Sequence, residues 1–513
     1  MRGVLSLLLL LLPQVGVAQC VLTTVGPPTG AAAFGSAVAS SADVLVAADP
    51  GGGAAGVIHR YVQDGMTWSA ASPIGPGTSG GGASFGAALA LEGGFLLVGA
   101  PTHNGPNGAH PSRGAVYAME LLGNSPGTPL TAPGTAPGDL FGSSLAWGTD
   151  LWVAGAPGAL GSAGSVSIFH WSATTGSVWD QTIAPTDPQP WAQFGASVVM
   201  HDDMLVVGSP GADSFRGAVY VFERTGTTWQ QVNKLTLASA QSGDRLGASI
   251  AVRTTGPALV IVAGAPGVDA ANAADAGIVA TFSQVGLASW TEGGLANPTP
   301  EPDAEFGADI AIELDRVLVG APGQFNYQGA ATLFRWSEGL GGGWTNEGTV
   351  GGTLGNFSEA GRALALVDGI AWLGARLAVG GGAVDGFVVA DRDCDGNGTL
   401  DRCDVLQGLV EDVNENQVPD ACEFFVRGDT DGDGATAFSD AVVLLSSLFL
   451  PWGEALDCLA AADVNMDSAI NLTDCVFLLN VLYLPGTPPV PAPWPGCGVG
   501  DAAWSCEVPS FCP

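Results

Sequence analysis

The feature that most constrains this chain is a phrase of residues that recurs seven times. Each copy opens with Phe-Gly or a variant, runs through an apolar strand ending in Gly-Ala-Pro or a variant, and reaches a Gly-Ala-Val-Tyr-like segment. Successive openings lie 51, 56, 53, 52, 60 and 54 residues apart. A period of this length indicates a repeat architecture, in which neighbouring units bury each other's apolar faces. The openings are Phe34-Gly35, Phe85-Gly86, Phe141-Gly142, Phe194-Gly195, Leu246-Gly247, Phe306-Gly307 and Ala360-Gly361.

One unit, from Phe194 to Leu237, shows what each copy contains. Turn residues divide it into four short strand-like segments, 196–200, 204–208, 217–223 and 229–237. Four short strands make one blade of a β-propeller. The sequence therefore predicts an all-β, seven-bladed propeller over residues 19–390. Tryptophans near the start of the fourth segment are expected to pack within the fold, and they are Trp68, Trp179, Trp229, Trp290 and Trp344.

These units resemble FG-GAP repeats, the blades of integrin α-chain propellers and of many exported bacterial proteins. The resemblance covers about residues 21–390. It implies a rim of variable loops that binds a partner, here an extracellular protein or polysaccharide. The Asp-x-Asp-x-Asp-Gly calcium motif of the integrin version is missing from these loops, so calcium is not expected in the propeller.

The two ends of the repeat region predict how the ring closes. The seventh unit runs out near Ala390 without a tryptophan-bearing outer strand, whereas residues 21–25 precede the first unit and are rich in β-branched side chains. A propeller must hide the edge between its first and last blades. We therefore expect residues 21–25 to pair beside 386–390. A disulfide from Cys20 to Cys394, Cys403 or Cys422 follows from this placement.

The N-terminus predicts export. Arg2, an apolar run over 4–12 and a small-residue ending at Ala18 have the order of a secretory signal peptide, residues 1–18. The run is too short to span a bilayer, and no later segment is long enough, so no transmembrane segment is expected. The mature protein is expected to be secreted or held at the cell surface. Lipid attachment at Cys20 is the alternative to a disulfide there.

The charge of the chain excludes some partners and reactions. Acidic side chains outnumber basic ones 49 to 15, a net charge of −34, which repels nucleic acid. Lys234 is the single lysine, which excludes a phosphate-binding loop and any other Schiff-base lysine. The acidity is concentrated after the propeller, because residues 391–480 carry 19 acidic and 3 basic side chains.

Four twelve-residue frames in this tail follow the pattern of Ca²⁺-binding loops, with oxygen ligands at positions 1, 3, 5, 9 and 12, except that Ala437 at position 9 of the third leaves that place to water. In the third, Gly434 stands at the sharp-turn position, whereas Ser468 replaces that glycine in the fourth. Apolar helix-length runs follow these two frames, at 441–450 and 475–484. Their expected ligands are Asp429, Asp431, Asp433 and Asp440, then Asp463, Asn465, Asp467, Asn471 and Asp474.

Duplicated loop-helix units with aspartate at position 12 resemble the type I dockerin domain. This domain, with a Cys-rich C-terminal extension, is assigned to residues 425–513. The resemblance implies Ca²⁺ and a cohesin-like partner, which dockerins contact through loop positions 10 and 11. Those positions are Phe438-Ser439 and Leu472-Thr473, more apolar than a pair of small hydroxyl residues, so the expected partner is cohesin-like but differs from a standard cohesin.

The first two frames, over residues 391–424, lack helix-length apolar runs and resemble the calcium repeats of thrombospondin type 3. Eight cysteines follow residue 393, and sequence alone leaves 105 pairings open for eight. A local disulfide between Cys394 and Cys403 is possible in the first frame, which leaves Cys422 without a local partner. The expected ligands are Asp393, Asp395, Asn397, Asp401 and Asp404, then Asp412, Asn414, Asn416, Asp420 and Glu423.

These features predict an exported, non-catalytic binding or scaffold protein with a calcium-stabilised tail. No histidine pair has the spacing of zinc ligands, and no nucleophile elbow is present. The alternative is a secreted carbohydrate-active enzyme delivered by its dockerin-like module. An acid-base pair of carboxylates facing each other would separate the two functions.

Overall fold

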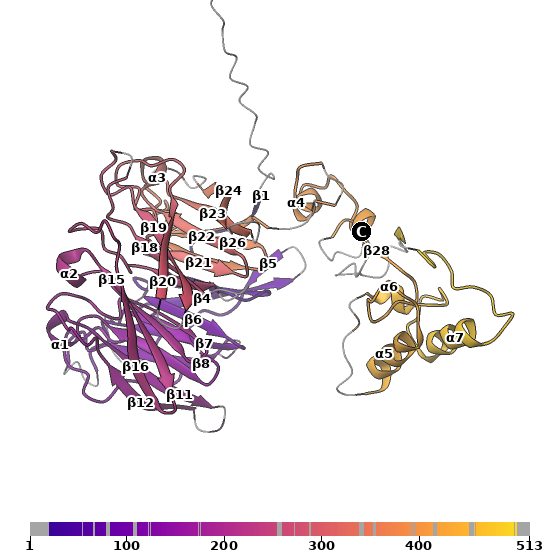
Figure 1. Ribbon diagram of the computed structural model, residues 1–513, viewed down its shortest axis with the longest axis horizontal. Coiled ribbons are helices and arrows are strands. Elements are labelled where there is room, and N and C mark those ends of the chain that lie inside the picture. Colours follow the sequence, from indigo (N-terminus) through magenta and orange to yellow (C-terminus); the bar gives the residue numbers. More distant parts are fainter. Residues whose placement is uncertain are drawn as a thin grey trace, which may run out of the picture. The chain divides into compact units, whose positions relative to one another are not determined.

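A computed structural model gives the arrangement of the chain (Figure 1). It describes residues 20–499 except 54, 65–66, 78–82, 106–109, 122, 124, 173, 175, 254–258, 271, 287–288, 338–342, 352–354, 356, 391–392, 395–396, 414–417, 451–455, 457 and 497. The signal peptide expected at 1–18 and the end of the Cys-rich extension lie outside these residues. The chain divides into two compact units, one of Val21–Gln63 and Trp68–Val389 and the other mainly of Ala390–Pro513. No described helix is long and apolar enough to span a membrane.

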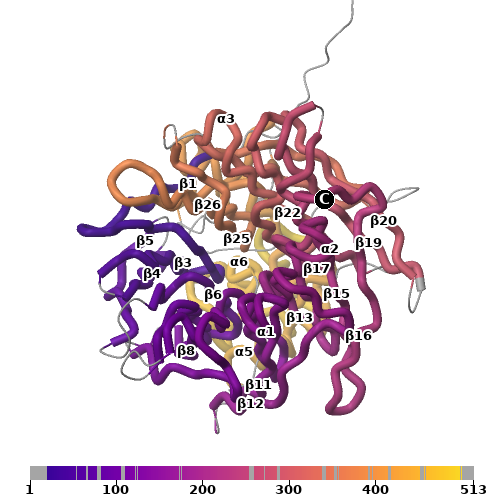
Figure 2. The backbone as a smooth tube through the Cα atoms, turned by 90° about the vertical axis from the view of Figure 1, so that its left-hand side faces the viewer, coloured from indigo at the N-terminus to yellow at the C-terminus, as the bar shows by residue number. Residues whose placement is uncertain are grey.

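The first unit is the predicted seven-bladed propeller, with one antiparallel sheet per blade (Figure 2). The innermost strands neighbour one another in chain order, and the innermost strand of blade 7 returns to that of blade 1. Blade 1 contains β2 (Val38–Ser40), β3 (Val44–Asp49), β4 (Val57–Asp64) and β5 (Thr67–Ala70); blade 2 contains β6 (Ala88–Glu92), β7 (Phe95–Ala100) and β8 (Ala115–Glu120). Blade 3 contains β9 (Ser144–Trp147), β10 (Leu151–Ala156), β11 (Ser165–Ser172) and β12 (Gly176–Ile183).

Blades 4 to 7 repeat the same order of strands. Blade 4 contains β13 (Ser197–His201), β14 (Met204–Ser209), β15 (Ala218–Thr225) and β16 (Thr228–Leu235); blade 5 contains β17 (Ile250–Arg253), β18 (Val260–Ala265), β19 (Ile278–Gly286) and β20 (Ser289–Ala296). Blade 6 contains β21 (Ile310–Glu313), β22 (Arg316–Ala321), β23 (Ala330–Ser337) and β24 (Gly343–Gly351); blade 7 contains β25 (Ala363–Val367), β26 (Ile370–Ala375), β27 (Ala383–Val388) and β1 (Cys20–Val25).

The ring closes through the N-terminal strand, as the sequence predicts. β1 pairs with β27 as the outer strand of blade 7, and Thr24 Oγ1 donates a hydrogen bond to Asp385 Oδ1 at 2.6 Å. The seam between blades 7 and 1 is built like the others, because a Cβ on Gly374 would collide with the carbonyl oxygen of Gly35. One apolar cluster crosses this seam and contains Trp372 of β26 and Leu45 of β3.

Most of the expected tryptophans lie on outer strands and pack in the core. Trp229 on β16 is only 6 % exposed, whereas Trp179 on β12 is 41 % exposed. Blade 2 departs from the four-strand pattern in the described residues. Its outer segment makes one bridge, between Leu130 and Val116. Prolines at 126 and 129 lack the N–H that a continuous ladder needs, and this blade also has no outer-strand tryptophan.

Three short turns on the propeller loops are wound in the left-handed sense. They are α1 (Ala159–Ser162), α2 (Ala212–Phe215) and α3 (Gln324–Tyr327), and each follows the Gly-Ala-Pro strand of its blade. Each turn contains residues other than glycine at positive φ, such as Asp213 at 50° and Phe325 at 52°. Backbone of this kind is unfavourable for residues with a Cβ and is found where surrounding structure holds it in place.

The second unit is small and partly helical. The apolar runs expected after the third and fourth frames are helices, which begin three residues earlier than the runs. A compact apolar cluster that includes Leu444 and Leu478 joins them. Its elements are α4 (Asp401–Leu406), a 3₁₀ turn (Asp420–Cys422), β28 (Phe424–Phe425), α5 (Phe438–Phe449), α6 (Leu459–Ala462), α7 (Leu472–Tyr483) and β29 (Gly498–Val499).

Candidate metal centre

The position-1 aspartate has the same environment in three of the four acidic frames. In the third frame, Asp429 Oδ1 accepts a hydrogen bond from the Asp433 N–H at 3.1 Å, and its Oδ2 accepts one from Gly434 N–H at 2.9 Å. Asp463 in the fourth frame and Asp393 in the first accept the equivalent two backbone bonds. The chain therefore winds into the same loop three times, as the spacing of the ligand positions predicts.

The third frame brings its first carboxylates together. Oxygen atoms of Asp429, Asp431 and Asp433 lie within 4.8 Å of one another. The backbone turns sharply at Gly434, where φ is 85°, and Ser468 adopts the equivalent conformation in the fourth frame with φ 65°. Serine therefore adopts, at this turn position, the left-handed conformation that glycine adopts in the third frame.

The position-12 aspartate closes each of the last two frames and starts the helix that follows. Asp440 Oδ1 accepts hydrogen bonds from the N–H groups of Thr430 and Asp431, and its Oδ2 accepts one from Ala437 N–H. Asp474 bonds in the same way to Asn465 N–H and Asn471 N–H. The second of these bonds satisfies a free donor at the helix start, which explains why α5 and α7 begin before the apolar runs.

Several of these carboxylates are buried, and none of them forms an ion pair with a described residue. Asp440 and Asp474 are fully buried, and Asp429 and Asp463 are each 3 % exposed. Burial raises the pKa of Asp429 to about 6, with neighbouring carboxylates contributing, and burial also raises the pKa values of Asp440 and Asp474. Buried Arg427 donates to the carbonyl oxygens of Ala460, Asp463 and Ala492. A divalent cation would offset this concentration of charge, so the residues fit Ca²⁺.

The first two frames are built differently from the last two. In the first two frames the aspartate at position 9 accepts a backbone hydrogen bond from the start of the loop, as the aspartate at position 12 does in the last two. Cys394 N–H donates to Asp401 Oδ1 at 2.9 Å, and Val413 N–H donates to Asp420 Oδ1 at 3.1 Å. Asp404 at position 12 is 1 % exposed, and its Oδ1 accepts no hydrogen bond from a described residue. A buried carboxylate oxygen without a partner fits a cation ligand. Glu423 is also buried.

Other expected ligands are only partly placed by the described residues. Asn465 and Asp467 lie on the fourth loop, where Asn465 Nδ2 donates to Asp467 Oδ2 at 3.0 Å. Asn471 Oδ1 accepts from the Thr473 N–H, so this side chain caps α7. Asn397 Nδ2 donates to Asp404 Oδ2 at 2.9 Å. Asp395, Asn414 and Asn416 lie outside the described residues, and Asp412 opens the second frame.

The disulfides correct one sequence interpretation. Cys20 is joined to Cys403, one of the three partners expected for it, and Cys394 is joined to Cys422. The local bridge between Cys394 and Cys403 is therefore not formed, and Cys422 has a partner in the other frame. Local spacing favoured the wrong pair because it ignores how the chain folds back to bring the two frames together. The cluster of Cys394, Asp401 and Cys422 offers no thiolate ligand, because both cysteines are disulfide-bonded.

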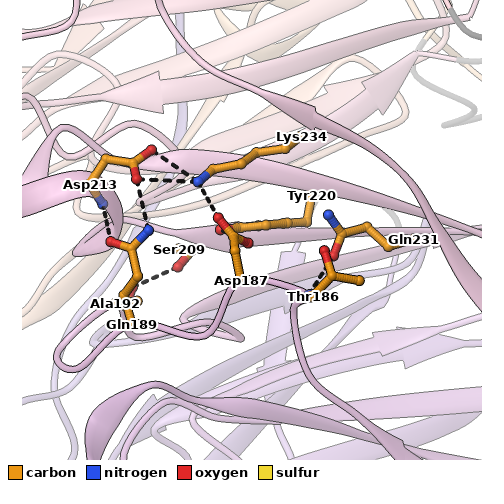
Figure 3. Close-up of polar contacts among 9 residues, drawn as sticks. All are labelled: Thr186, Asp187, Gln189, Ala192, Ser209, Asp213, Tyr220, Gln231 and Lys234. Atoms are coloured by element: carbon orange, nitrogen blue, oxygen red, sulfur yellow. Dashed lines mark hydrogen bonds and ion pairs between the residues drawn. The ribbon is translucent and has the colours of Figure 1, made fainter.

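Sequence reasoning did not find a polar network on the propeller loops (Figure 3). Lys234 Nζ on β16 contacts Asp187 Oδ2 at 2.6 Å and Asp213 Oδ2 at 3.0 Å. Gln189 exchanges two hydrogen bonds with Asp213, and Tyr220 OH donates to Asp187 Oδ1. The single lysine thus ties the loop before blade 4 to the α2 turn. The sequence feature that could have pointed to this network is that Lys234 is the single lysine of the chain.

Comparison with known proteins supports the propeller. A family described as FG-GAP repeat matches residues 179–222, which cover part of the outer strand of blade 3 and most of the first three strands of blade 4. No curated protein matches the chain. The fold together with this match is compatible with a binding or scaffold role.

Proposed function

We propose that this chain is an exported binding protein in which the propeller loops hold a protein or glycan partner and a calcium-folded, dockerin-like tail docks or anchors it. The observation that carries the proposal is the repeated carboxylate loop of the tail. In this proposal Asp429, Asp431, Asp433 and Asp440 hold one Ca²⁺ ion, and the frame that begins at Asp463 holds a second. Calcium supplies the positive charge that lets these buried carboxylates stay ionised.

The two earlier frames are proposed as weaker calcium loops of the thrombospondin type 3 kind. Asp404, with its unpartnered buried oxygen, supports a cation in the first of them. The disulfide between Cys394 and Cys422 joins the two frames, so binding in one stabilises the other.

The docking role of the tail rests on apolar side chains at matching places in its two copies. Phe438 and Leu472, at loop position 10, are 57 % and 49 % exposed. Val442 and Val476, four residues further along α5 and α7, are exposed as well. Exposed apolar surface that recurs in both halves of a duplicated module suits contact with another protein. The partner is a cohesin-like domain with an apolar contact surface.

Calorimetry of the full chain tests the calcium proposal. In calcium we expect two unfolding transitions, and chelation should abolish the transition of the tail while the propeller transition and the far-ultraviolet β signal stay in place. This outcome is expected because metal binding energy becomes folding energy where ligands are buried. Two transitions that both ignore the chelator would refute a calcium-folded tail, and a chelator-sensitive propeller transition would show that its loops bind metal.

A further inference from the structure

A cavity of about 500 Å³ lies where blade 4 passes to blade 5. The α2 turn and the connection after β16 form it, with Gln189, Ser214, Arg216 and Thr236 among the lining residues. Pockets of this size hold small molecules or a few sugar rings. The polar side chains that line it suit a hydroxylated ligand better than an apolar one.

Arg216 places a positive charge in the lining of the cavity, close enough to Asp213 and Asp244 to favour their ionised forms. Its exposed side chain forms no hydrogen bond or ion pair with the described residues. Gln189 and Lys234 hold the nearby carboxylate of Asp213 (Figure 3). Their hydrogen bonds lower the pKa of Asp213, and the bond from Gln189 contributes most. An arginine guanidinium is well matched to a carboxylate, because its parallel N–H groups bond to both oxygens.

The repeat itself shows that the fold does not need this arginine. Arg216 is the residue that ends the α2 turn, and the equivalent residues that end α1 and α3 are Ala163 and Gln328. All three turns have the same left-handed backbone. Blade 2 has an arginine at the same place, Arg113 before Gly114, whose Nε donates to Thr135 Oγ1 at 2.8 Å. Arg216 in blade 4 lies beside the cavity and has no such bond to a described residue.

Trp191 lies on the loop that contributes Gln189 to the cavity lining, and it gives a second sign of function. It is 64 % exposed with φ 65°, and blades 3 and 5 have Gly138 and Gly243 at the equivalent position. Its backbone is fixed against the turn, because a Cβ on Gly211 would collide with the Trp191 carbonyl oxygen. A bulky residue in a conformation that suits glycine costs stability, and its exposed ring gains nothing from burial. Phe215, at φ 64° and 47 % exposed, repeats this pattern beside Arg216.

We propose that this cavity binds an acidic oligosaccharide, in which a uronate carboxylate pairs with Arg216, sugar hydroxyls bond to Ser214 and Thr236, and Trp191 and Phe215 flank the site with aromatic surface. Sugar rings carry both apolar faces and hydroxyl edges, which match an aromatic side chain beside polar groups. A uronate carboxylate on the ligand would explain why the positively charged Arg216 lies beside the cavity. This inference rests on the proposed binding function of the propeller and names its site and ligand class.

The test compares two ligands that differ only in the carboxylate. Isothermal titration of the full chain in calcium uses a short oligoglucuronate and a cello-oligosaccharide of the same length. We expect the oligoglucuronate to bind about tenfold or more tightly than the neutral sugar, as a charge-assisted pair would give. Arg216→Gln should remove that difference and leave binding of the neutral sugar unchanged. Arg335→Gln, at an exposed arginine paired with Asp315, is the matched control and should change neither.

Trp191→Gly separates a binding role from a structural one. This change installs the residue that blades 3 and 5 carry, so the melting temperature should stay the same or rise. Affinity for both sugars should nevertheless fall by about fivefold or more if the ring contacts them. Wild-type affinity in this variant would remove Trp191 from the site.

Three results would overturn the proposal: no binding of oligoglucuronate, equal affinity for the acidic and neutral sugars, or tighter binding of a polyglutamate peptide, which would identify a site for acidic proteins. The calcium-sensitive transition of the tail is recorded on the same sample. If that transition persists while sugar binding fails, this inference fails and the calcium-folded tail stands.

Discussion

The propeller and the tail differ in the side chains that they bury. In the propeller the second strands of several blades, such as β10 and β18, are buried at every residue, and no cysteine lies between Cys20 and Cys394. The tail buries the carboxylates of Asp440 and Asp474 beside a much smaller apolar core. Repetition lets each blade cover its neighbours, whereas a small unit with little apolar area needs disulfides or metal to stay folded.

The sharpest way to break this comparison is to remove ligands from the tail alone. Asp429→Ala combined with Asp463→Ala should abolish tail folding at any calcium concentration, because both frames lose the carboxylate that organises the loop. The propeller transition should not move. Calorimetry and calcium titration of the full chain measure both effects, with at least two ions expected to bind the wild type.

Asp202→Ala with Asp203→Ala removes the same charge from an exposed propeller hairpin and is the matched control for that double variant. It should leave both transitions and the calcium count unchanged. A wild-type tail that binds no calcium, or a double variant that still folds its tail in calcium, would contradict the loop assignment.

The reverse experiment disturbs the propeller and spares the tail. Gly374→Val places a branched side chain where even a Cβ would collide with the Gly35 carbonyl oxygen, at the seam between blades 7 and 1. We expect the propeller to lose about 3 kcal/mol or more of unfolding free energy, measured by denaturant titration. Gly343→Ala, where an added Cβ meets nothing within 4 Å, is the control. Equal stability of the two variants would mean that the seam is not tightly closed.

Most of the propeller fold could be predicted from the sequence because the same residue types recur at the same positions in seven units. The seven openings, the outer strand supplied by 21–25 and the left-handed Ser468 all follow from residue types at fixed positions. Only the continuous outer strand expected for blade 2 was mispredicted, because prolines interrupt the hydrogen-bond ladder there. Local sequence patterns do not predict contacts between segments that come together only on folding. The disulfide between Cys394 and Cys422 and the cavity at Arg216 both depend on such contacts.

Acidity should act in opposite directions on the tail with and without calcium. Without calcium, the pKa of Asp429 in the folded tail is raised to about 6, above its unfolded value, so the folded form holds its proton more tightly. The stability of the calcium-free tail is therefore greatest below the unfolded pKa and falls as pH rises through about 6. With calcium, protonation competes with the ion, and stability falls as pH drops through the same range.

Chemical denaturation across this pH range gives the slope in calcium. Because chelation is expected to unfold the tail at neutral pH, the slope in chelator is measured as recovery of the helical far-ultraviolet signal of the tail when the pH falls below about 6. The propeller serves as the internal control, since these carboxylates belong to the tail. Slopes of the same sign in both conditions would show that the buried aspartates do not bind the ion.

The smallest expected effect compares the third and fourth acidic frames with each other. Gly434 and Ser468 occupy the same turn position at φ 85° and 65°, but only serine has a Cβ that this conformation strains. Ser468→Gly should stabilise the calcium-bound tail by about 1 kcal/mol and tighten the fourth loop, whereas Gly434→Ser should destabilise the third by a similar amount. The gain is reduced because glycine also makes the unfolded chain more flexible. Denaturant unfolding and calcium titration of both variants measure the pair of effects. If Ser468→Gly weakened the tail, the serine side chain would contribute to the loop, and strain at the turn position would not limit its stability. The hydrogen bond from Ser468 N–H to Asp463 is available to either residue.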